Sequence, residues 1–518
     1  MSFEELADSV IDRITSPRTV VPLVCLFVFA SLLQTRGADP DLFARVAAGH
    51  LITLAGKVPI VDPFAYTAKK ALWIDHEWLA ALTFYGVSRG GDLALQVVRA
   101  LGAFASIAVL FAAQEIYAPK AKSGFVLLLV GAMDSSYVWS SVVRSQLFTY
   151  FFLPVYLLIF VLAFRRRSLT GIIFLPLIML VWANAHGGFV VGLGLHALAA
   201  GAFLIERRAG WIHLAVTFAV SVLVVAFLNP YPGFSFSTYM IEAVTMPRPT
   251  ITEWGPLRLS NPASWTTISI GLLVLGGALT TRKLPPLHVG LFLASAVFFA
   301  ARANRLAAIF SMVCVVYGAE YVDALIDAVE RRRPSLLVAA KRMGGVATCG
   351  IALLCVVHVA MRAAEGTLVP LTLDTYPVQA LEWLRANGKD GKKLLVDFNN
   401  GSYALWRLYP KTQISMDGRY EEVYPESTVT DVADAFDPAS PTYAESWKKT
   451  KSDYVLLPVR SVGFSKREAY GADLSVVYQD EKFALLGRAE DVVTPANPES
   501  AKLGGFDKWQ PVFSVIPR

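Results

Sequence analysis

Acidic, imidazole and guanidinium side chains gather in residues 36–92, a segment that lies between two apolar blocks. It contains Asp39-Pro40-Asp41, Arg45 and Asp75-His76-Glu77. Carboxylates accept a proton from a hydroxyl group or bind a divalent metal ion, and an imidazole can also transfer a proton. The segment is therefore the first candidate for a site of chemistry.

Four later connections between apolar blocks also carry polar side chains. These are Arg144 and Gln146, then Asn184 and His186, then Glu253, and finally Arg302 and Arg305. Arginine is suited to hold phosphate because its planar guanidinium makes two parallel hydrogen bonds. Together with the first segment, the mixture favours a site for a substrate that carries a phosphate.

Each group also has a structural explanation. Asp39 could cap the helix that begins near Asp41, and His76 could simply lie on the surface. Asn184 and His186 could satisfy backbone groups where two helices meet, and Arg302 and Arg305 could anchor helices at an interface. His196, within an apolar block, is better explained as a packing residue. Ionisable groups at membrane depth are costly and usually functional, which favours a shared site for the others.

The composition indicates that these groups are positioned by a membrane-embedded helical bundle. Hydrophobic residues make up 55% of the chain, charged residues only 17%, and the mean hydropathy is +0.49. Apolar blocks long enough to cross about 30 Å of hydrocarbon predict roughly eleven spanning helices. The predicted spans are 19–35, 93–113, 124–140, 146–164, 169–185, 188–205, 211–228, 263–280, 286–301, 305–322 and 344–362. Cys25, Cys314, Cys349 and Cys355 fall inside these blocks, which favours packing over disulfides or a zinc site.

The basic clusters predict the orientation of the bundle. They follow even-numbered spans and comprise Lys120 with Lys122, Arg165–Arg167, Arg207 with Arg208, Arg282 with Lys283, and Arg331–Arg333 with Lys341 and Arg342. The positive-inside rule therefore places these loops and the N-terminus in the cytoplasm, and the candidate site outside. The net charge of +6 reflects these clusters and does not indicate nucleic-acid binding.

The chain after the last span has a different character. Strands are predicted at 393–398, 412–416, 453–458, 474–478 and 482–487, and a helix at 378–386. We expect a transmembrane domain of residues 1–366 with a large external loop at 36–92, followed by an extracytoplasmic α/β domain of residues 367–518. Two amphipathic stretches of the loop, 41–55 and 76–88, are expected to lie along the membrane surface.

The predicted location restricts the chemistry. Nucleotide-activated sugars are cytoplasmic, so a transferase that faces outward needs a donor that arrives with a lipid. A polyprenyl-phosphate sugar meets this need, because its phosphate lies at the depth where the arginines are expected.

The sequence resembles the GT-C membrane glycosyltransferases, which use polyprenyl- or dolichyl-phosphate-linked sugars, and in particular a bacterial branch of that superfamily. The residues that carry the resemblance are Asp39-Pro40-Asp41-Leu42-Phe43 with Gly49, Val58-Pro59, Asp62-Pro63-Phe64-Ala65-Tyr66-Thr67, Trp73 to Leu79, Arg144-Ser145-Gln146-Leu147-Phe148, Trp182 to Gly187, Asn229-Pro230-Tyr231, Gly401-Ser402-Tyr403 with Trp406, and Asp417-Gly418-Arg419 before Tyr424. The resemblance implies a bacterial inner-membrane enzyme with a periplasmic C-terminal domain. It also implies a catalytic carboxylate in the first external loop, which corresponds to Asp41, with Asp39 second.

Two positions depart from that pattern. The branch often has Trp-Trp-His after the Asp-Leu pair, where this chain has Phe43-Ala44-Arg45, and the second external loop lacks an Asp-x-Asp motif. A divalent ion, Mg²⁺ or Mn²⁺, therefore remains an open expectation, with Asp41, Asp75, His76 and Glu77 as candidate ligands.

The implied reaction is an inverting transfer of a hexosyl or pentosyl unit to a glycan, lipid or protein acceptor. Asp41 would orient or deprotonate the acceptor hydroxyl, and Arg144, Arg302 and Arg305 would stabilise the departing lipid phosphate. Arg45, His76, Glu77, Gln146, Asn184, His186 and Glu253 are the expected substrate-binding residues. Two alternatives stay open: a polysaccharide polymerase or ligase that uses a diphosphate-linked lipid, and a transporter or lipid-carrier flippase.

Overall fold

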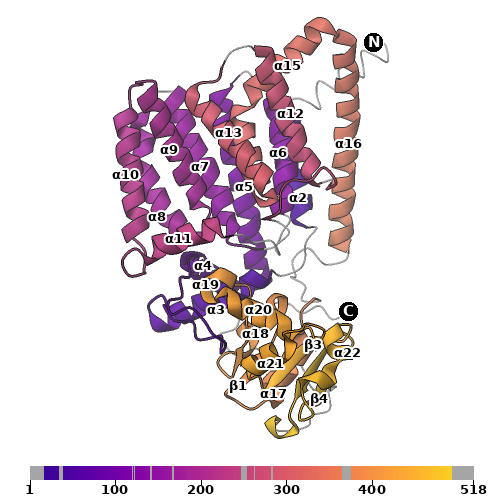
Figure 1. Cartoon of the computed structure of the whole chain (residues 1–518). Coiled ribbons are helices and arrows are strands. Elements are labelled where there is room, and N and C mark those ends of the chain that lie inside the picture. The colour runs from indigo at the N-terminus through magenta and orange to yellow at the C-terminus, as the bar shows by residue number, and fades with distance from the viewer. Residues whose placement is uncertain are drawn as a thin grey trace.

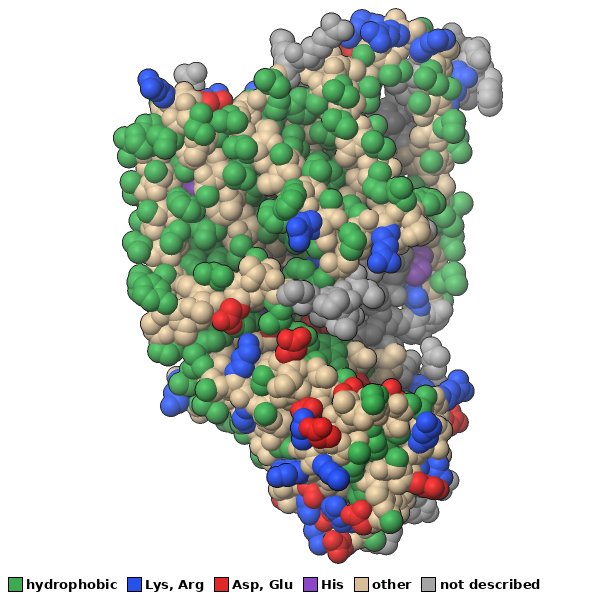
Figure 2. All heavy atoms as spheres, viewed as in Figure 1, with side chains coloured by type: hydrophobic (Ala, Val, Ile, Leu, Met, Phe, Trp, Pro, Cys, Tyr) green, Lys and Arg blue, Asp and Glu red, His purple; other side chains and the backbone are tan. Residues whose placement is uncertain are grey.

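A helical bundle forms one end of the molecule, and a smaller α/β unit forms the other (Figure 1). The computed structural model describes residues 17–33, 39–119, 121, 123–139, 143–165, 168–246, 254–261, 263–281, 284–364 and 375–492. Apolar side chains cover the outside of the bundle, whereas charged side chains gather on the α/β unit and at the far end of the bundle (Figure 2). Leu223, Leu279 and Leu353 are examples of large apolar side chains that are more than half exposed. An apolar outer surface of this extent is typical of a protein solvated by lipid.

The bundle is built from helices of different lengths, and all of them except α15 (Ala319–Arg332) are mainly apolar. They are α2 (Pro17–Leu32), α5 (Gly91–Tyr117), α6 (Gly124–Trp139), α7 (Gln146–Arg165), α8 (Leu175–Ala185), α9 (Phe189–Ile205), α10 (Trp211–Phe227), α12 (Ala263–Thr281), α13 (Leu287–Arg302), α14 (Ala307–Tyr317), α15 (Ala319–Arg332) and α16 (Pro334–Ala364). Within the described residues, four helices are long and apolar enough to cross a membrane, or five if a bent pair counts as one span. The total of about eleven spans stays a prediction.

The predicted span 305–322 is wrong as a single straight helix. The structure breaks it between Tyr317 and Ala319, where the chain bends by 66°. At Gly318 an added Cβ would lie 2.5 Å from the carbonyl oxygen of Cys314, so the bend needs a residue without a side chain. The following helix, α15, carries Glu320, Asp323 and Asp327, so the bent pair is at most a broken span.

The α/β unit contains a five-stranded mixed sheet, and its five strands match the five predicted ones. They are β1 (Lys392–Leu395), β2 (Thr412–Ile414), β3 (Tyr454–Pro458), β4 (Ser475–Gln479) and β5 (Phe483–Gly487). Their order is β2-β1-β3-β5-β4, with β1 parallel to β2 and β3, and β5 antiparallel to β3 and β4. The helices are α17 (Val378–Asn387), α18 (Phe398–Leu408), α19 (Tyr420–Val423), α20 (Glu426–Ala435), α21 (Tyr443–Thr450) and α22 (Val462–Ser465).

The segment 39–92 packs into the core of this unit. Its helices α3 (Pro40–Ala55) and α4 (Trp78–Ser88) lie between the bundle and the sheet (Figure 1), and α11 (Ser235–Thr245) lies beside them. Phe43 is fully buried against the rings of Tyr403 and Trp406, and Ala65 pairs with Ile414 at the free edge of β2. Both amphipathic stretches form the expected helices. α3 packs between α4 and α18, and its apolar side chains complete the core of the tail. Its place along a membrane surface stays a prediction.

Candidate functional site

The N-terminus of α3 carries the two acidic residues expected at the centre of the site. Asp39 caps the helix, since its Oδ1 accepts a hydrogen bond of 2.9 Å from the backbone N–H of Asp41, as its position predicted. Arg144 bridges both carboxylates, with Nε 2.8 Å from Asp39 and Nη2 3.0 Å from Asp41. The Asp41 side chain is 38% exposed and that of Asp39 only 9%. Burial, together with the charge of Asp41, raises the pKa of Asp39 to about 7. Asp41 is therefore the accessible carboxylate of the pair.

One helical turn further along, Arg45 lies at the centre of a buried cluster. Its guanidinium contacts Asp75 at 2.5 Å, Glu77 at 2.8 Å, and Glu422, whose Oε2 accepts a hydrogen bond of 3.2 Å. These side chains are all less than 10% exposed. Three carboxylates around one guanidinium carry a net negative charge, so the cluster favours additional protons.

His76 is the side chain that such a proton would occupy. Its Nδ1 lies 3.2 Å from Glu422 and 3.2 Å from the Tyr239 hydroxyl, and its Nε2 lies 3.6 Å from Glu77. Burial alone would lower the pKa of His76, but the carboxylates of Glu422 and Glu77 outweigh burial and raise it. Burial raises the pKa of Asp75 to about 6, whereas Arg45 overcomes burial at Glu77 and lowers its pKa to about 2.

His186 approaches the cluster from the end of α8. Its Nδ1 accepts a hydrogen bond of 2.9 Å from the backbone N–H of Gly188 and lies 2.7 Å from the Thr149 hydroxyl. The proton of a neutral ring must therefore lie on Nε2, which faces Glu77 at 3.6 Å. Burial lowers the pKa of His186 to about 3, so this ring is neutral near pH 7.

Asn184 has the structural role that its position also allowed. Its side-chain amide donates to the backbone carbonyls of Leu180 and Leu228, and its oxygen accepts a hydrogen bond of 2.8 Å from Trp78. It therefore joins α8 to α4 and supports the site from the bundle side.

Three consecutive residues at the start of α7 connect the parts of the site. Arg144 binds Asp41, the Ser145 hydroxyl donates to Glu77 at 2.7 Å, and the Gln146 amide oxygen, when turned toward Arg305, accepts from its Nε at 3.2 Å. The Arg305 guanidinium also lies over the Trp254 ring, 5.3 Å from its centroid. One short segment thus places the exposed carboxylate, the buried cluster and a half-exposed arginine side by side.

Two predicted residues are not joined to this group. Arg302 is exposed at the end of α13 and lies over the Phe298 ring, 5.8 Å from its centroid. Glu253 lies outside the described residues. The sequence also missed Glu422, Ser145 and Tyr239 as members of the site. No local pattern marks them, because each contributes through a contact with a distant segment.

The donor groups around Arg45 do not fit a divalent metal ion in this arrangement. Within the described ranges, no three His, Cys, Asp or Glu residues are placed to hold a metal. Asp75, Glu77 and Glu422 already surround a guanidinium, and its positive charge would repel a second cation at the same oxygens. Asp39 and Asp41 in turn share Arg144.

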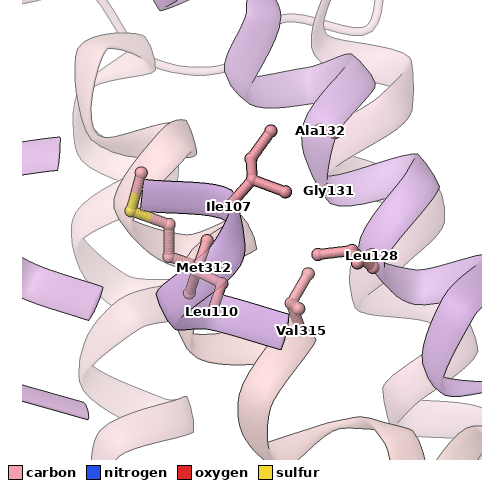
Figure 3. A pocket seen from close by; sticks show the side chains of 7 residues that line it. All are labelled: Ile107, Leu110, Leu128, Gly131, Ala132, Met312 and Val315. Carbon is pink, nitrogen blue, oxygen red and sulfur yellow. The ribbon is translucent and has the colours of Figure 1, made fainter. Parts of the chain in front are cut away.

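A small pocket inside the bundle does not overlap with the site. Its lining, shown in Figure 3, consists of Ile107, Leu110, Leu128, Gly131, Ala132, Met312 and Val315. None of these residues offers a polar side chain, so the pocket provides no group for chemistry.

Similarity to known proteins is seen at the level of structure. No protein-family profile matches the chain, and no curated protein sequence matches it. Among solved structures, the archaeal oligosaccharyltransferase AglB from Archaeoglobus fulgidus, in complex with an inhibitory peptide and a dolichol-phosphate, is 14% identical with a TM-score of 0.57. The alignment covers 87% of this chain and 70% of AglB.

A second structure is similar over almost the full length of both chains. ArnT from Cupriavidus metallidurans bound to undecaprenyl phosphate is 14% identical with a TM-score of 0.51, over 90% of this chain and 97% of ArnT. A further AglB structure, a complex with Zn and sulfate, is 15% identical with a TM-score of 0.51, over 87% of this chain and 69% of the other. Both proteins belong to the GT-C superfamily, and this chain therefore has the fold of the GT-C membrane glycosyltransferases.

Proposed function

We propose that the protein is a membrane glycosyltransferase that moves a sugar from a polyprenyl-phosphate donor to an acceptor on the side of the bundle that carries the tail. The observation that carries this proposal is the pairing of the exposed Asp41 with Arg144, next to Gln146 and Arg305. A carboxylate that can accept a proton stands beside guanidinium groups that can bind a phosphate. The lipid phosphates bound by AglB and ArnT support the same class of donor.

In the proposed reaction, an acceptor hydroxyl attacks the anomeric carbon of the donor. The proton of the hydroxyl passes to the Asp41 carboxylate, a new carbon–oxygen bond forms, and the bond to the lipid phosphate breaks. The electron pair of that bond leaves with the phosphate oxygen, whose charge Arg305 and Arg144 stabilise. Attack on the face opposite the leaving phosphate inverts the anomeric configuration.

The buried cluster has a supporting role in this proposal. We assign Arg45 to holding the loop against the tail, since three carboxylates occupy its guanidinium. His76 is the most exposed member of this cluster, and Glu77 is linked to the Arg144 segment through Ser145, so these two would position hydroxyl groups of the sugar. We derive no step through a metal ion, because the residues present do not fit one.

The orientation of the chain is part of the same proposal. Lys and Arg side chains gather at the end of the bundle away from the tail (Figure 2), where Arg331, Arg332 and Arg333 close α15. By the positive-inside rule this end faces the cytoplasm, which supports a bacterial inner-membrane protein with its tail in the periplasm. We retain about eleven spans and a division near residue 366 as proposals on the same basis.

A donor panel tests the function directly. Purified protein in liposomes is incubated with radiolabelled polyprenyl-phosphate sugars, the matching diphosphate-linked sugars, and membrane extract as the source of acceptor. We expect label to leave a monophosphate donor and to appear in a product with the opposite anomeric configuration. Transfer from diphosphate donors alone would identify a polymerase or ligase, and lipid movement between leaflets without a covalent product would identify a flippase.

A further inference from the structure

A short segment of the tail, residues 417–422, touches the candidate site at two points. At its start, Gly418 faces the Asp41 carboxylate so closely that an added Cβ would lie 3.0 Å from Asp41 Oδ1. At its end, Glu422 contacts Arg45 and His76 in the buried cluster. Both contacts come from a part of the chain more than 360 positions after the end of α3, so the tail forms one wall of the site.

The conformation of this segment is fixed by its neighbours. Arg419 is 3% exposed, and both oxygens of Asp417 bind its guanidinium, at 2.8 and 2.7 Å. Asp62 of the first loop accepts a third bond of 2.6 Å, and the Tyr424 hydroxyl donates to Asp417 at 2.6 Å. These bonds on both sides of Gly418 leave its backbone little freedom to withdraw from Asp41.

The remaining neighbours of Gly418 also restrict the movement of its backbone. Its backbone N–H donates to the Ser402 hydroxyl at 3.2 Å, and the same added Cβ would lie 3.2 Å from that oxygen. Ser402 is fully buried in α18, and Gly401 beside it lies so close to the Met416 carbonyl that an added Cβ would come within 1.9 Å. The backbone of the tail therefore cannot move back, and a larger side chain at position 418 would displace the carboxylate instead.

We infer that Gly418 is a positioning residue of the transfer site, and that its missing side chain sets the place of the Asp41 carboxylate opposite Arg144. This inference rests on the proposed function. It gives the tail a part in the reaction itself, in addition to any role in binding the acceptor. A displacement of a few tenths of an ångström at the reacting group lowers the rate of the chemical step, while binding of the lipid donor elsewhere is retained.

The test compares two Gly→Ala variants of the full chain in liposomes. Gly418→Ala adds a methyl group against Asp41, and Gly86→Ala adds one on the exposed face of α4, where no atom lies within 4 Å. We expect Gly418→Ala to lower kcat at least about tenfold with an unchanged KM for the polyprenyl-phosphate sugar and an unchanged melting temperature. We expect Gly86→Ala to match the wild type in kcat and KM and to melt at the same or a slightly higher temperature, because alanine favours a helix interior more than glycine does.

The outcomes separate this inference from the proposed function. If the wild type transfers sugar and Gly418→Ala retains the kcat of Gly86→Ala, the positioning role is refuted and the transferase remains. A fall in melting temperature together with proportional loss of active protein at constant kcat would also refute it, because the effect would then be on folding. A wild type without transfer from any lipid donor would overturn both.

Discussion

Arg45 of α3 and Glu422 of α19 are 377 positions apart in the sequence and are bound to each other by two hydrogen bonds in a buried cluster. This pair joins the segment 39–92 to the tail, in the buried cluster that Ser145 connects to Arg144 and Asp41. The segment and the tail therefore form one structural unit at the end of the bundle, and substitutions in either should affect the site.

Loss of the central cation should destabilise this unit strongly. Arg45→Met would leave Asp75, Glu77 and Glu422 buried without their shared partner, which typically costs about 3–5 kcal/mol. We expect a clear fall in the melting temperature of the purified protein, measured by scanning fluorimetry in detergent. Arg467→Met, at an exposed position of the tail, is the control. Equal melting temperatures for the two variants would disprove the central role of Arg45.

Arg419 should likewise be intolerant of lysine. Its guanidinium binds Asp417 and Asp62 and lies 4.9 Å from the centroids of both Phe64 and Trp73. A lysine ammonium keeps the charge but cannot bind Asp417 at two points or stack on the rings, so Arg419→Lys should lose about 2 kcal/mol of stability.

The melting temperature of Arg419→Lys should be compared with that of the corresponding variant at a partly exposed arginine of α17. Arg385→Lys keeps a cation that can still pair with Glu382 within the same helix, so it should change the melting temperature little. An Arg419→Lys protein as stable as Arg385→Lys would show that the charge alone matters.

Stability should fall as the pH rises above about 5. In the folded state burial raises the pKa of Asp39 to about 7 from its ordinary 3.8, and the carboxylates of Glu422 and Glu77 raise the pKa of His76 above its ordinary 6.5. Both groups therefore hold protons that the unfolded chain releases. Their stabilising contributions are complete below the unfolded pKa values and are lost as the pH passes through the folded ones. Arg45 lowers the pKa of Glu77 to about 2 from its ordinary 4.5, so this group acts in the opposite sense. Its stabilising contribution is lost only as the pH falls toward 2.

The substitution Asp39→Asn tests this pH dependence. An amide beside Asp41 and Arg144 does not release a proton, so the melting temperature of this variant should decline less than that of the wild type between pH 4 and 7. If the melting temperatures of the variant and the wild type declined equally across that interval, Asp39 would titrate normally in the folded protein.

The two arginines that the sequence treated as equivalent should differ in function. Arg305 is linked through Gln146 to the segment that binds Asp41, whereas Arg302 is exposed and lies over Phe298. Loss of a charge-assisted bond to a phosphate costs roughly 1.5–3 kcal/mol, so Arg305→Gln should lower kcat/KM for the lipid donor about 10- to 100-fold. Arg302→Gln should leave this ratio unchanged in the same liposome assay. Equal losses in both variants would contradict the assignment.

The elements that carry a strong local signal could be predicted from the sequence. The apolar blocks give most bundle helices, and alternation bounded by Gly and Pro gives all five strands of the tail. Asp39 could be recognised as a cap because this role depends only on its two neighbours. The break near Gly318 was missed, because the apolar pattern continues through it although the helix axis bends there.

The site could be predicted only in part, for the same reason. The residue types and their positions between the apolar blocks were enough to predict that Asp41, Arg144, His76 and Arg305 lie at the same end of the bundle. Glu422 has no local mark, and Gly418 was noted only within the Asp417-Gly418-Arg419 motif, since the roles of both arise from tertiary contacts with α3. The sequence predicted α3 as an amphipathic helix but did not show that it packs against the tail, because the tail contributes most of the side chains of that core.

The most direct test is the rate of sugar transfer by Asp41→Asn in liposomes that contain a polyprenyl-phosphate donor used by the wild type. Asparagine keeps the shape of the side chain and the cap of α3 remains with Asp39, but the amide cannot accept the hydroxyl proton. We predict at least a 100-fold loss of kcat, about the lower bound for a general base, in protein that melts at the wild-type temperature. Transfer at the wild-type rate by this variant would contradict the proposed role of Asp41.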